Sequence, residues 1–314
     1  MNTLGAKAPF PFKNQNIETI CNKCYNLFMK NYNLKKDIKT IRELFSLSAE
    51  EYAEKVGLSR MNISRYENGK AQPRDSSLEK IYSLPYSEGF HLNKAKELLF
   101  IDNKKERCLL FHGSKFGLDR IDSNHLVGTK DFGAGFYLGE TFESASIWIC
   151  EYNESSVYAF YFQNSENLKI INFDVSKEWL FAILYYRETF NNYELNSEIK
   201  TLIKNIEQSD AIIAPIADNQ MYDTINRFAQ GEITDEQCIH ALSATNLGKQ
   251  FVLKTQKAIN QLTLIDHMFL CSQEKKDCLK VKKENYKLGR DKAQLSIREY
   301  ARKGYYIDEL FKKI

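Results

Sequence analysis

The stretch Asp131-Phe-Gly-Ala-Gly-Phe-Tyr-Leu-Gly-Glu-Thr141 indicates how the second half of this chain folds. Gly133, Gly135 and Gly139 allow the backbone to turn and to approach a ligand closely, and Tyr137 sets an aromatic ring among them. Taken singly, such glycines usually mark turns and such aromatic residues usually lie in a core. The stretch points to a binding site because a second one, Phe111-His-Gly-Ser114, precedes it at the end of a predicted strand.

Around these two stretches, residues 108–264 alternate short β-rich runs with helical runs, which predicts an α+β domain. Thr141 is expected to cap the helix after the glycine-rich stretch, and that helix would turn Trp148 toward the same pocket. The strands are predicted at residues 108–111, 135–138, 156–162, 169–173, 210–214 and 250–253. The helices, of which the first follows the glycine-rich stretch, are predicted at residues 144–152, 177–189, 220–229 and 235–243.

In order and spacing, these segments resemble the ADP-ribosyltransferase superfamily of the diphtheria-toxin and poly(ADP-ribose) polymerase type. The signature is His-Gly-Ser, then Gly-x-Gly-Phe-Tyr-Leu-Gly-Glu-Thr, then a helix with a tryptophan, and it is closest to a bacterial group with toxin-like members. The resemblance extends through residues 210–218 and 248–255. It implies split antiparallel sheets with flanking helices, and NAD as the substrate without a metal.

The resemblance also implies a triad of histidine, tyrosine and glutamate. His112 would hold the ribose, Tyr137 would stack on the nicotinamide, and the third position carries Gln250 instead of glutamate. An amide can hydrogen-bond a ribose hydroxyl but cannot act as a general base, so transfer of a single ADP-ribose is expected rather than polymer growth. Glu140 and Glu232 are the alternative acids. The implied NAD-binding residues are Gly113, Ser114, Gly135, Phe136 and Trp148.

A second motif, at residues 38–73, predicts a helix-turn-helix. Ser48 and Glu51 form a capping box, Gly57 supplies the turn, and Ser59 caps the next helix. The expected contacts between the helices come from Ala53, Val56, Leu58 and Ile63, and the residues expected to bind DNA are Arg60, Asn62, Ser64 and Arg65.

This motif resembles the repressor-type (Cro/C1) helix-turn-helix domain of bacterial regulators and antitoxins. One position departs from that family, because Ala49 stands where a glutamine often supports a phosphate contact. Residues 35–85 hold 10 Lys and Arg against 8 Asp and Glu, which is a weak positive charge for an operator-binding domain. Use of the same fold for dimerisation or protein docking therefore stays as an alternative to DNA binding.

The predicted organisation has five parts. An N-terminal helical segment, residues 1–34, has its helix from about Ile17, and the helix-turn-helix of residues 35–85 is closed by Pro85. A connecting helix follows in residues 86–107, then the transferase-like domain of residues 108–264. Residues 265–314 form a basic helical extension, with 13 Lys and Arg against 7 Asp and Glu from Glu274 onward. That charge fits a solvated helical face or, alternatively, a patch that contacts nucleic acid.

Composition limits the remaining function classes. A formal net charge of +3 identifies no partner, and no run of 18 or more uncharged apolar residues exists for a membrane span. The N-terminus lacks the charged-then-apolar order of a signal peptide. Seven cysteines without a framework spacing suit a reducing compartment, so a cytoplasmic protein is expected. The pair Cys21 and Cys24 lacks a second pair, so no zinc site is expected. Phosphate-loop, zinc-protease and serine-hydrolase motifs are missing from the sequence.

These observations lead to an NAD-dependent mono-ADP-ribosyltransferase with a fused DNA-binding regulatory domain, acting as a bacterial toxin or phage-defence effector. The acceptor would be a macromolecule, either protein, RNA or DNA. An antitoxin and a second copy of the chain are further candidate partners. Two alternatives stay open: a transcription regulator whose degenerate transferase fold senses NAD or ADP-ribose, and an NAD glycohydrolase.

Overall fold

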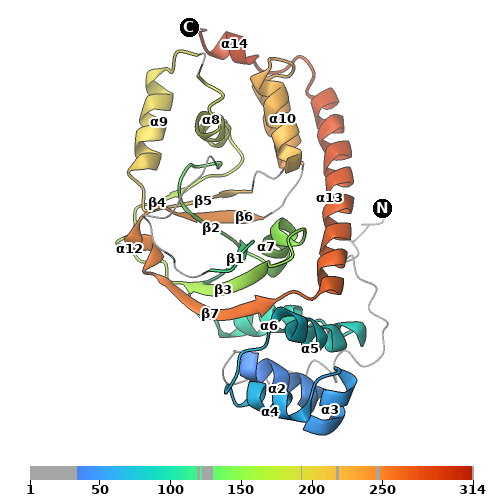
Figure 1. Ribbon diagram of the computed structural model, residues 1–314. Coiled ribbons are helices and arrows are strands. Elements are labelled where there is room, and N and C mark those ends of the chain that lie inside the picture. Colours follow the sequence, from blue (N-terminus) through green and yellow to red (C-terminus); the bar gives the residue numbers. More distant parts are fainter. Residues whose placement is uncertain are drawn as a thin grey trace, which may run out of the picture. The chain divides into compact units, whose positions relative to one another are not determined.

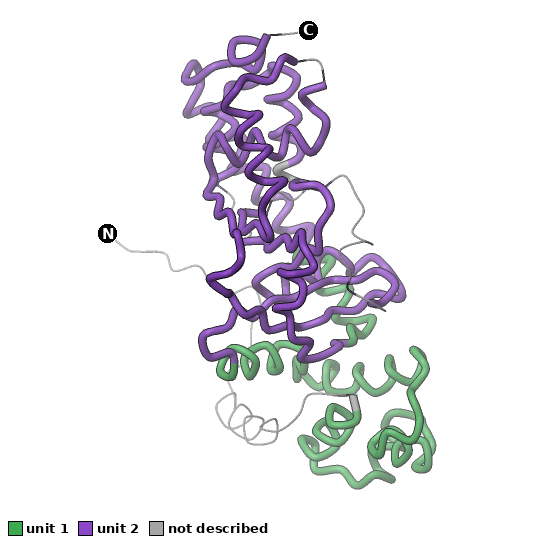
Figure 2. The backbone as a smooth tube through the Cα atoms, turned by 90° about the vertical axis from the view of Figure 1, so that its left-hand side faces the viewer, with its two compact units in different colours: residues 1–103, 269–281 green, residues 104–268, 282–314 purple. Residues whose placement is uncertain are grey.

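The computed structural model describes residues 34–118, 121, 130–191, 193–216, 219–244 and 248–312. The chain forms two compact units, shown in different colours in Figure 2. The first comprises residues 1–103 and 269–281, and the second comprises residues 104–268 and 282–314. The N-terminal segment predicted from the sequence, with the helix from Ile17 and the pair Cys21 and Cys24, lies outside the described residues.

The first unit is helical, as predicted. Ser48 caps α3 in a capping box with Glu51, and the Ser59 hydroxyl accepts a hydrogen bond from the backbone N–H of Asn62 at 3.2 Å. Gly57 adopts a φ of +61° between these two helices, a conformation that favours glycine. The helices are α2 (Leu34–Leu44), α3 (Ala49–Lys55), α4 (Arg60–Glu67), α5 (Asp75–Ser87), α6 (Leu92–Asn103) and the beginning of α13 (Ser272–Glu299).

The predicted contacts of the helix-turn-helix are confirmed. Ala53, Val56 and Ile63 are buried in one hydrophobic cluster, and Leu58 packs against it. Tyr52 and Ile81 belong to the same cluster, which joins α3 and α5. The local capping signals and the apolar spacing therefore act together to form this motif.

The prediction that Pro85 closes this domain is wrong, because Pro85 lies inside α5, which continues to Ser87. A proline within a helix removes the N–H that would bond the carbonyl four residues earlier, here that of Ile81. In this fold the buried Tyr52 hydroxyl donates to the Ile81 carbonyl at 3.4 Å. A side chain from α3 thus satisfies the group that the proline leaves free.

A buried ion pair lies in the core of the first unit. Lys96 of α6 is fully buried, and its ammonium group contacts the Asp37 carboxylate of α2. The Tyr82 hydroxyl of α5 donates to the same carboxylate at 2.6 Å. Three helices therefore meet at one carboxylate, whose charge is compensated inside the core.

The second unit is built on a seven-stranded sheet with the order β4-β5-β6-β2-β1-β3-β7. All the paired registers that the structure describes are antiparallel except that of β4 with β5, which is parallel. The strands are β1 (Cys108–Ser114), β2 (Phe136–Gly139), β3 (Ser156–Phe162), β4 (Ile170–Asn172), β5 (Ala211–Pro215), β6 (Lys249–Leu253) and β7 (Leu262–Phe269).

The expectation of split sheets needs correction, because the described strands form one sheet that is joined weakly near its middle. β1 and β2 share only the register pair Phe111 and Gly139, whereas β1 pairs with β3 along its whole length. Beyond this pair the two strands diverge, so each half of the sheet keeps its own neighbours. The divergence creates the space for the site described below.

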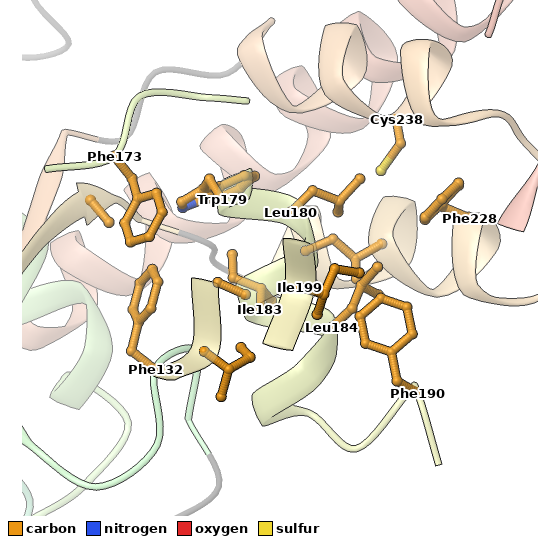
Figure 3. Packing of buried hydrophobic residues seen from close by; sticks show 14 of the residues in the cluster. Phe132, Phe173, Trp179, Leu180, Ile183, Leu184, Phe190, Ile199, Phe228 and Cys238 are labelled. Atoms are coloured by element: carbon orange, nitrogen blue, oxygen red, sulfur yellow. The ribbon is translucent and has the colours of Figure 1, made fainter. Parts of the chain in front are cut away.

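Helices cover both halves of the sheet. Figure 1 shows α8 (Lys177–Tyr186) between α9 (Ser197–Glu207) and α10 (Asn219–Ala229). Trp179, Leu180 and Ile183 of α8 are fully buried at the centre of the cluster in Figure 3. The remaining helices of this unit are α7 (Phe142–Ile149), α11 (Asp235–Ser243), α12 (Gln256–Ile259), α14 (Ile307–Leu310) and the later part of α13.

The predicted strands and helices of this unit are present, with ends that differ by a few residues, but three elements were missed, namely α9, α12 and β7. Helix α9 has its apolar residues Ile199, Ile203 and Ile206 on one buried face. The sequence after Leu264 was expected to be basic and helical, whereas β7 extends to Phe269 before α13 begins. The polar residues of β7 suit an edge strand with one exposed face, and this weakens the apolar signal.

No helix among the described residues is long and apolar enough to cross a membrane. In the same part of the chain, no group of three or more His, Cys, Asp or Glu side chains is arranged to hold a metal ion.

Candidate active site

A cavity of about 600 Å³ opens in the second unit where β1 and β2 diverge. It contains the three residues predicted as the catalytic triad, His112 from β1, Tyr137 from β2 and Gln250 from β6. Its size falls within the usual range for ligand-binding clefts. The lining also includes the acids Asp131 and Glu188, the cations Lys115, Lys130 and Arg187, and Gly113, Gly139, Trp148 and Tyr222.

His112 is held in one orientation by the neighbouring strand. Its Nδ1 lies 2.8 Å from the backbone oxygen of Tyr137, and Phe136 stacks on the imidazole with ring centroids 4.4 Å apart. Because a carbonyl oxygen only accepts hydrogen bonds, Nδ1 carries the proton and Nε2 keeps a free lone pair. Burial lowers the pKa of His112 to about 4, despite the opposing effect of this hydrogen bond. The imidazole is therefore neutral and offers an acceptor.

This pKa has a measurable consequence. An unfolded histidine titrates at about 6.5, so between pH 6.5 and 4 the unfolded chain binds a proton that the folded chain excludes. His112 thus contributes stability above this window, and the contribution is lost as the pH falls through it. We expect the His112 imidazole signals in a ¹³C-labelled NMR titration to stay unchanged between about pH 8 and 5.5. The chain has five histidines, and His112→Ala assigns the signal; a midpoint near 6.5 would contradict the expectation.

Tyr137 presents its ring to the cavity while its hydroxyl is tied to the preceding turn. The hydroxyl donates to the Gly133 carbonyl at 2.8 Å and accepts from the Phe132 N–H at 3.1 Å. Burial raises the pKa of Tyr137, so the phenol remains protonated. The Lys130 ammonium lies 4.5 Å from the ring centroid, which shows that this ring face accommodates a cation.

The turn before β2 is anchored in the core. Phe132 is fully buried and faces Phe173 in Figure 3. The centroids of the two stacked rings are 5.6 Å apart. Gly133 has a φ of +73°, and a Cβ atom there would lie 2.9 Å from the Tyr186 ring. These two residues hold the backbone of Lys130 and Asp131 at the edge of the cavity.

Gln250 is the buried end of a polar network. Its Nε2 donates to Asp131 Oδ2 at 3.1 Å and to the Pro215 carbonyl at 3.0 Å. Arg187 donates to Asp131 Oδ1 through Nε at 3.1 Å and through Nη2 at 2.5 Å. The Asp131 carboxylate therefore lies beside position 250, where the resemblance would place a glutamate.

Arg187 also has a buried group without a partner. Its Nη1 has no hydrogen-bond acceptor among the described residues, while its guanidinium group lies 4.9 Å from the Tyr222 ring centroid. A buried guanidinium N–H without an acceptor is costly. An anionic or carbonyl group of a ligand in the cavity would satisfy it.

Two lysines add positive charge to the cavity lining. Burial and the nearby Lys115 ammonium lower the pKa of Lys130. Lys115 lies over the Tyr152 ring, 4.3 Å from its centroid. Neither lysine forms an ion pair with a carboxylate in the part of the chain that the structure describes. The Asp131 carboxylate partly offsets these effects on the pKa of Lys130. Two neighbouring cations that form no ion pair in this part of the chain favour the binding of an anion.

The predicted NAD-binding residues separate into two groups. Gly113 and Trp148 line the cavity, and the Trp148 side chain is 46% exposed at its edge. Ser114, Gly135 and Phe136 are not part of the lining: the Ser114 hydroxyl donates to the Gly117 carbonyl, Gly135 lies against Val252, and Phe136 supports His112 from behind.

The two alternative acids lie elsewhere. Glu140 accepts a hydrogen bond from the Lys249 N–H at 3.0 Å, and Glu232 pairs with Arg227 at 3.2 Å. Neither lines the cavity. Asp131, which does, was quoted in the sequence motif without a role. Lys115 adjoins the His-Gly-Ser motif and Lys130 adjoins Asp131, so both could have been predicted as residues of the site. No motif in the sequence indicates that Arg187 or Tyr222 lines the cavity.

The helix-turn-helix in the first unit presents the residues predicted to bind DNA on α4. Arg60, Ser64 and Arg65 are exposed, and Asn62 is half-buried. Arg60 makes only a loose contact of 3.8 Å with the exposed Glu50. Asn68 Nδ2 donates to the Ser64 carbonyl at 2.7 Å and closes the end of this helix. The exposed face of α4 is thus open to a partner.

Comparison with known proteins agrees with this division of the chain. A helix-turn-helix family model of the Cro/C1 type matches residues 38–81, which supports DNA binding by the first unit. A family model described as "protein of unknown function (DUF3990)" matches residues 108–264, half of the chain. No match was found among curated proteins or among solved structures. The cavity with His112, Tyr137 and Gln250 lies within the second match, and the chain accordingly belongs to the DUF3990 family.

Proposed function

We propose that this protein is an NAD-dependent mono-ADP-ribosyltransferase that modifies a macromolecule. The observation that carries the proposal is the composition of the cavity. His112, Tyr137 and Gln250 line it together with the cations Lys115, Lys130 and Arg187. The three triad residues suit the ribose and the nicotinamide attached to it. The three cations suit the pyrophosphate of NAD, which carries two negative charges.

The neutral acceptors would serve the ribose. His112 Nε2 and Gln250 Oε1 can each accept a hydrogen bond from a ribose hydroxyl. The bond between the ribose C1′ and nicotinamide then breaks, and its electron pair leaves with nicotinamide, which becomes neutral. The nucleophile of the acceptor forms a bond to C1′ and loses its proton to solvent. The protein's task is to orient these groups and to stabilise the cationic ribose, which needs little covalent help.

The aromatic and cationic residues would serve the rest of NAD. The cationic nicotinamide ring can take the place that the Lys130 ammonium holds over Tyr137, 4.5 Å from the ring centroid. The displaced ammonium, Lys115 and the unpartnered Arg187 Nη1 would then contact the pyrophosphate. The fit accounts for the positive charge along the cavity lining and for the buried guanidinium N–H.

Gln250 favours transfer of one ADP-ribose unit over polymer growth. The residue has no carboxylate that could remove a proton from an incoming ADP-ribose hydroxyl, and general-base help is worth about 10² to 10⁴ in rate. The same residue favours the second candidate, a transcription regulator that senses NAD or ADP-ribose without turnover. An NAD glycohydrolase would use the same cavity with water as the acceptor.

A labelled-substrate experiment separates these candidates. The purified chain and its His112→Ala variant are incubated with NAD labelled in the adenylate phosphate and with a bacterial lysate. The products are then divided between protease and nuclease digestion. We expect macromolecular label that depends on His112 and that only one of the digestions removes, which identifies the acceptor as protein or nucleic acid.

The other outcomes reject the proposal. NAD consumption without macromolecular label identifies a glycohydrolase. Intact NAD without label favours the sensing regulator, which predicts that NAD changes the affinity of the wild-type chain for DNA. The role as a toxin or phage-defence effector, with or without an antitoxin, further requires that expression of the wild-type chain arrests growth and that expression of His112→Ala does not.

We also propose that Arg60, Asn62, Ser64 and Arg65 read the DNA major groove. Arg65→Ala is expected to weaken binding to a DNA sequence selected by the wild-type chain by about 1–3 kcal/mol, because an arginine bonded to a guanine is worth this much. Binding is measured by fluorescence anisotropy at fixed salt. The matched control is Lys39→Ala on α2, a charge that is 59% exposed. Equal losses in both variants would mean that Arg65 contributes only general charge.

A further inference from the structure

We propose that Asp131 is a positioning residue that, together with Arg187, orients the Gln250 amide so that its oxygen faces the cavity. This inference rests on the proposed function, in which Gln250 Oε1 accepts a hydrogen bond from a ribose hydroxyl of NAD. It assigns a role to a carboxylate that the sequence motif contains but that the resemblance leaves unused.

The orientation of the amide follows from its partners. Gln250 Nε2 lies 3.1 Å from Asp131 Oδ2 and 3.0 Å from the Pro215 carbonyl oxygen. A carboxylate and a carbonyl only accept, so the NH₂ group must face both and supplies one hydrogen to each. With both hydrogens used, Oε1 is the atom left for a ligand. A flipped amide would place Oε1 against two other oxygens.

Asp131 is itself held from two sides. Arg187 donates to Oδ1 through Nε and Nη2, at 3.1 and 2.5 Å, in a charge-assisted contact. The next residue, Phe132, is fully buried and fixes the backbone. The carboxylate is 11% exposed, so its bond to Gln250 is largely shielded from water. An amide whose NH₂ donates to a carboxylate also has a more electron-rich oxygen, because hydrogen bonds in a chain polarise one another.

This arrangement leads to an unexpected requirement at position 250. Gln250→Glu introduces the glutamate that the resemblance to ADP-ribosyltransferases places in the triad. It would, however, set a second carboxylate beside Asp131 Oδ2. Two carboxylates in one site repel each other unless they share a proton. The variant should therefore be a poorer transferase than the wild type, and glutamine is the residue that suits this cavity.

The test is a double-mutant cycle on the full chain, with Asp131→Asn, Gln250→Glu and the combination of both. The readouts are kcat and KM for NAD, and circular dichroism at increasing temperature checks folding. In the combined variant the amide at position 131 can donate to the carboxylate at position 250. The contact with the Pro215 carbonyl is not restored, so the expected recovery is partial. Glu143→Gln is the matched control, since it removes one acid from an exposed position on α7.

We expect each single variant to lower kcat at least about tenfold, because a buried polar group is left without its partner. KM should change less than about threefold, and the combined variant should recover at least about fivefold over Gln250→Glu. A purely structural role would not produce this recovery. Wild-type kcat in Asp131→Asn, or single effects that simply multiply, would overturn the inference. A wild-type chain that leaves NAD intact would instead reject the proposed function, and the inference with it.

Discussion

Replacement of Lys96 by alanine is expected to lower the free energy of unfolding of the first unit by about 3–5 kcal/mol, the loss found when one partner of a buried ion pair is removed. Lys96 is fully buried and contacts Asp37, a carboxylate that is also buried. Without the ammonium group, the Tyr82 hydroxyl remains as a partner at 2.6 Å, but it carries no positive charge. A loss of this size is a large part of the stability of an ordinary domain.

Hydrogen exchange read by mass spectrometry measures this effect where it occurs. Peptides from α2, α5 and α6 should exchange faster in Lys96→Ala, whereas tryptophan fluorescence reports only the second unit because Trp148 and Trp179 both lie there. The control Lys39→Ala removes an exposed lysine that lies 3.7 Å from Glu43, and it should cost less than about 1 kcal/mol. Similar losses in the two variants would show that burial of the Lys96 pair is unimportant.

Replacement of Gly113 by alanine is expected to damage the cavity more than any other small change in it. A Cβ atom at Gly113 would lie 2.5 Å from the Ala145 backbone oxygen and 3.0 Å from Ile149 Cγ2. Both atoms belong to α7, so the helix itself must move away from β1. Overpacking of this kind costs about 1–3 kcal/mol. The shift also carries Trp148, and we expect NAD turnover to fall about 10²-fold, since a 1 Å misplacement can cost that much.

Gly139→Ala is the matched variant for stability. The added Cβ atom there would lie 2.5 Å from Ser144 Oγ, the end of a side chain that can rotate, so helix α7 can stay in place. Thermal unfolding of both variants is compared with that of the wild type. If Gly113→Ala proves as stable as Gly139→Ala and keeps its turnover, then close packing of β1 against α7 is not what requires glycine at position 113.

The helix-turn-helix could be predicted in detail because its signals are local. Ser48 with Glu51, Gly57 and Ser59 each act within one turn of the chain, and all four have the predicted roles. The end of α5 could not be predicted from Pro85. A proline inside a helix frees the carbonyl four residues earlier, and here the donor to that carbonyl is Tyr52, 29 residues away from Ile81.

The second unit shows the same contrast between near and distant residues. The strands that carry His112, Tyr137 and Gln250 could be predicted from their apolar and β-branched residues, and the glycine-rich stretch marked the cavity between them. The prediction of split sheets overlooked the register pair between Phe111 and Gly139 that joins β1 to β2. Strand β7 was missed because polar residues on its exposed face weaken the apolar signal. Helix α9 could have been predicted, because Ile199, Ile203 and Ile206 have the spacing of one helix face.

The sequence by itself therefore determined the helix-turn-helix, the α+β character of the second unit and the identity of five residues in its cavity. Helix caps, turns and strand propensities depend on residues that are close in the chain, so the order of the amino acids is enough to predict them. Only the tertiary structure decided what surrounds Gln250. Arg187 reaches Asp131 across 56 residues and Asp131 reaches Gln250 across 119, and such contacts exist only after the core has brought their elements together.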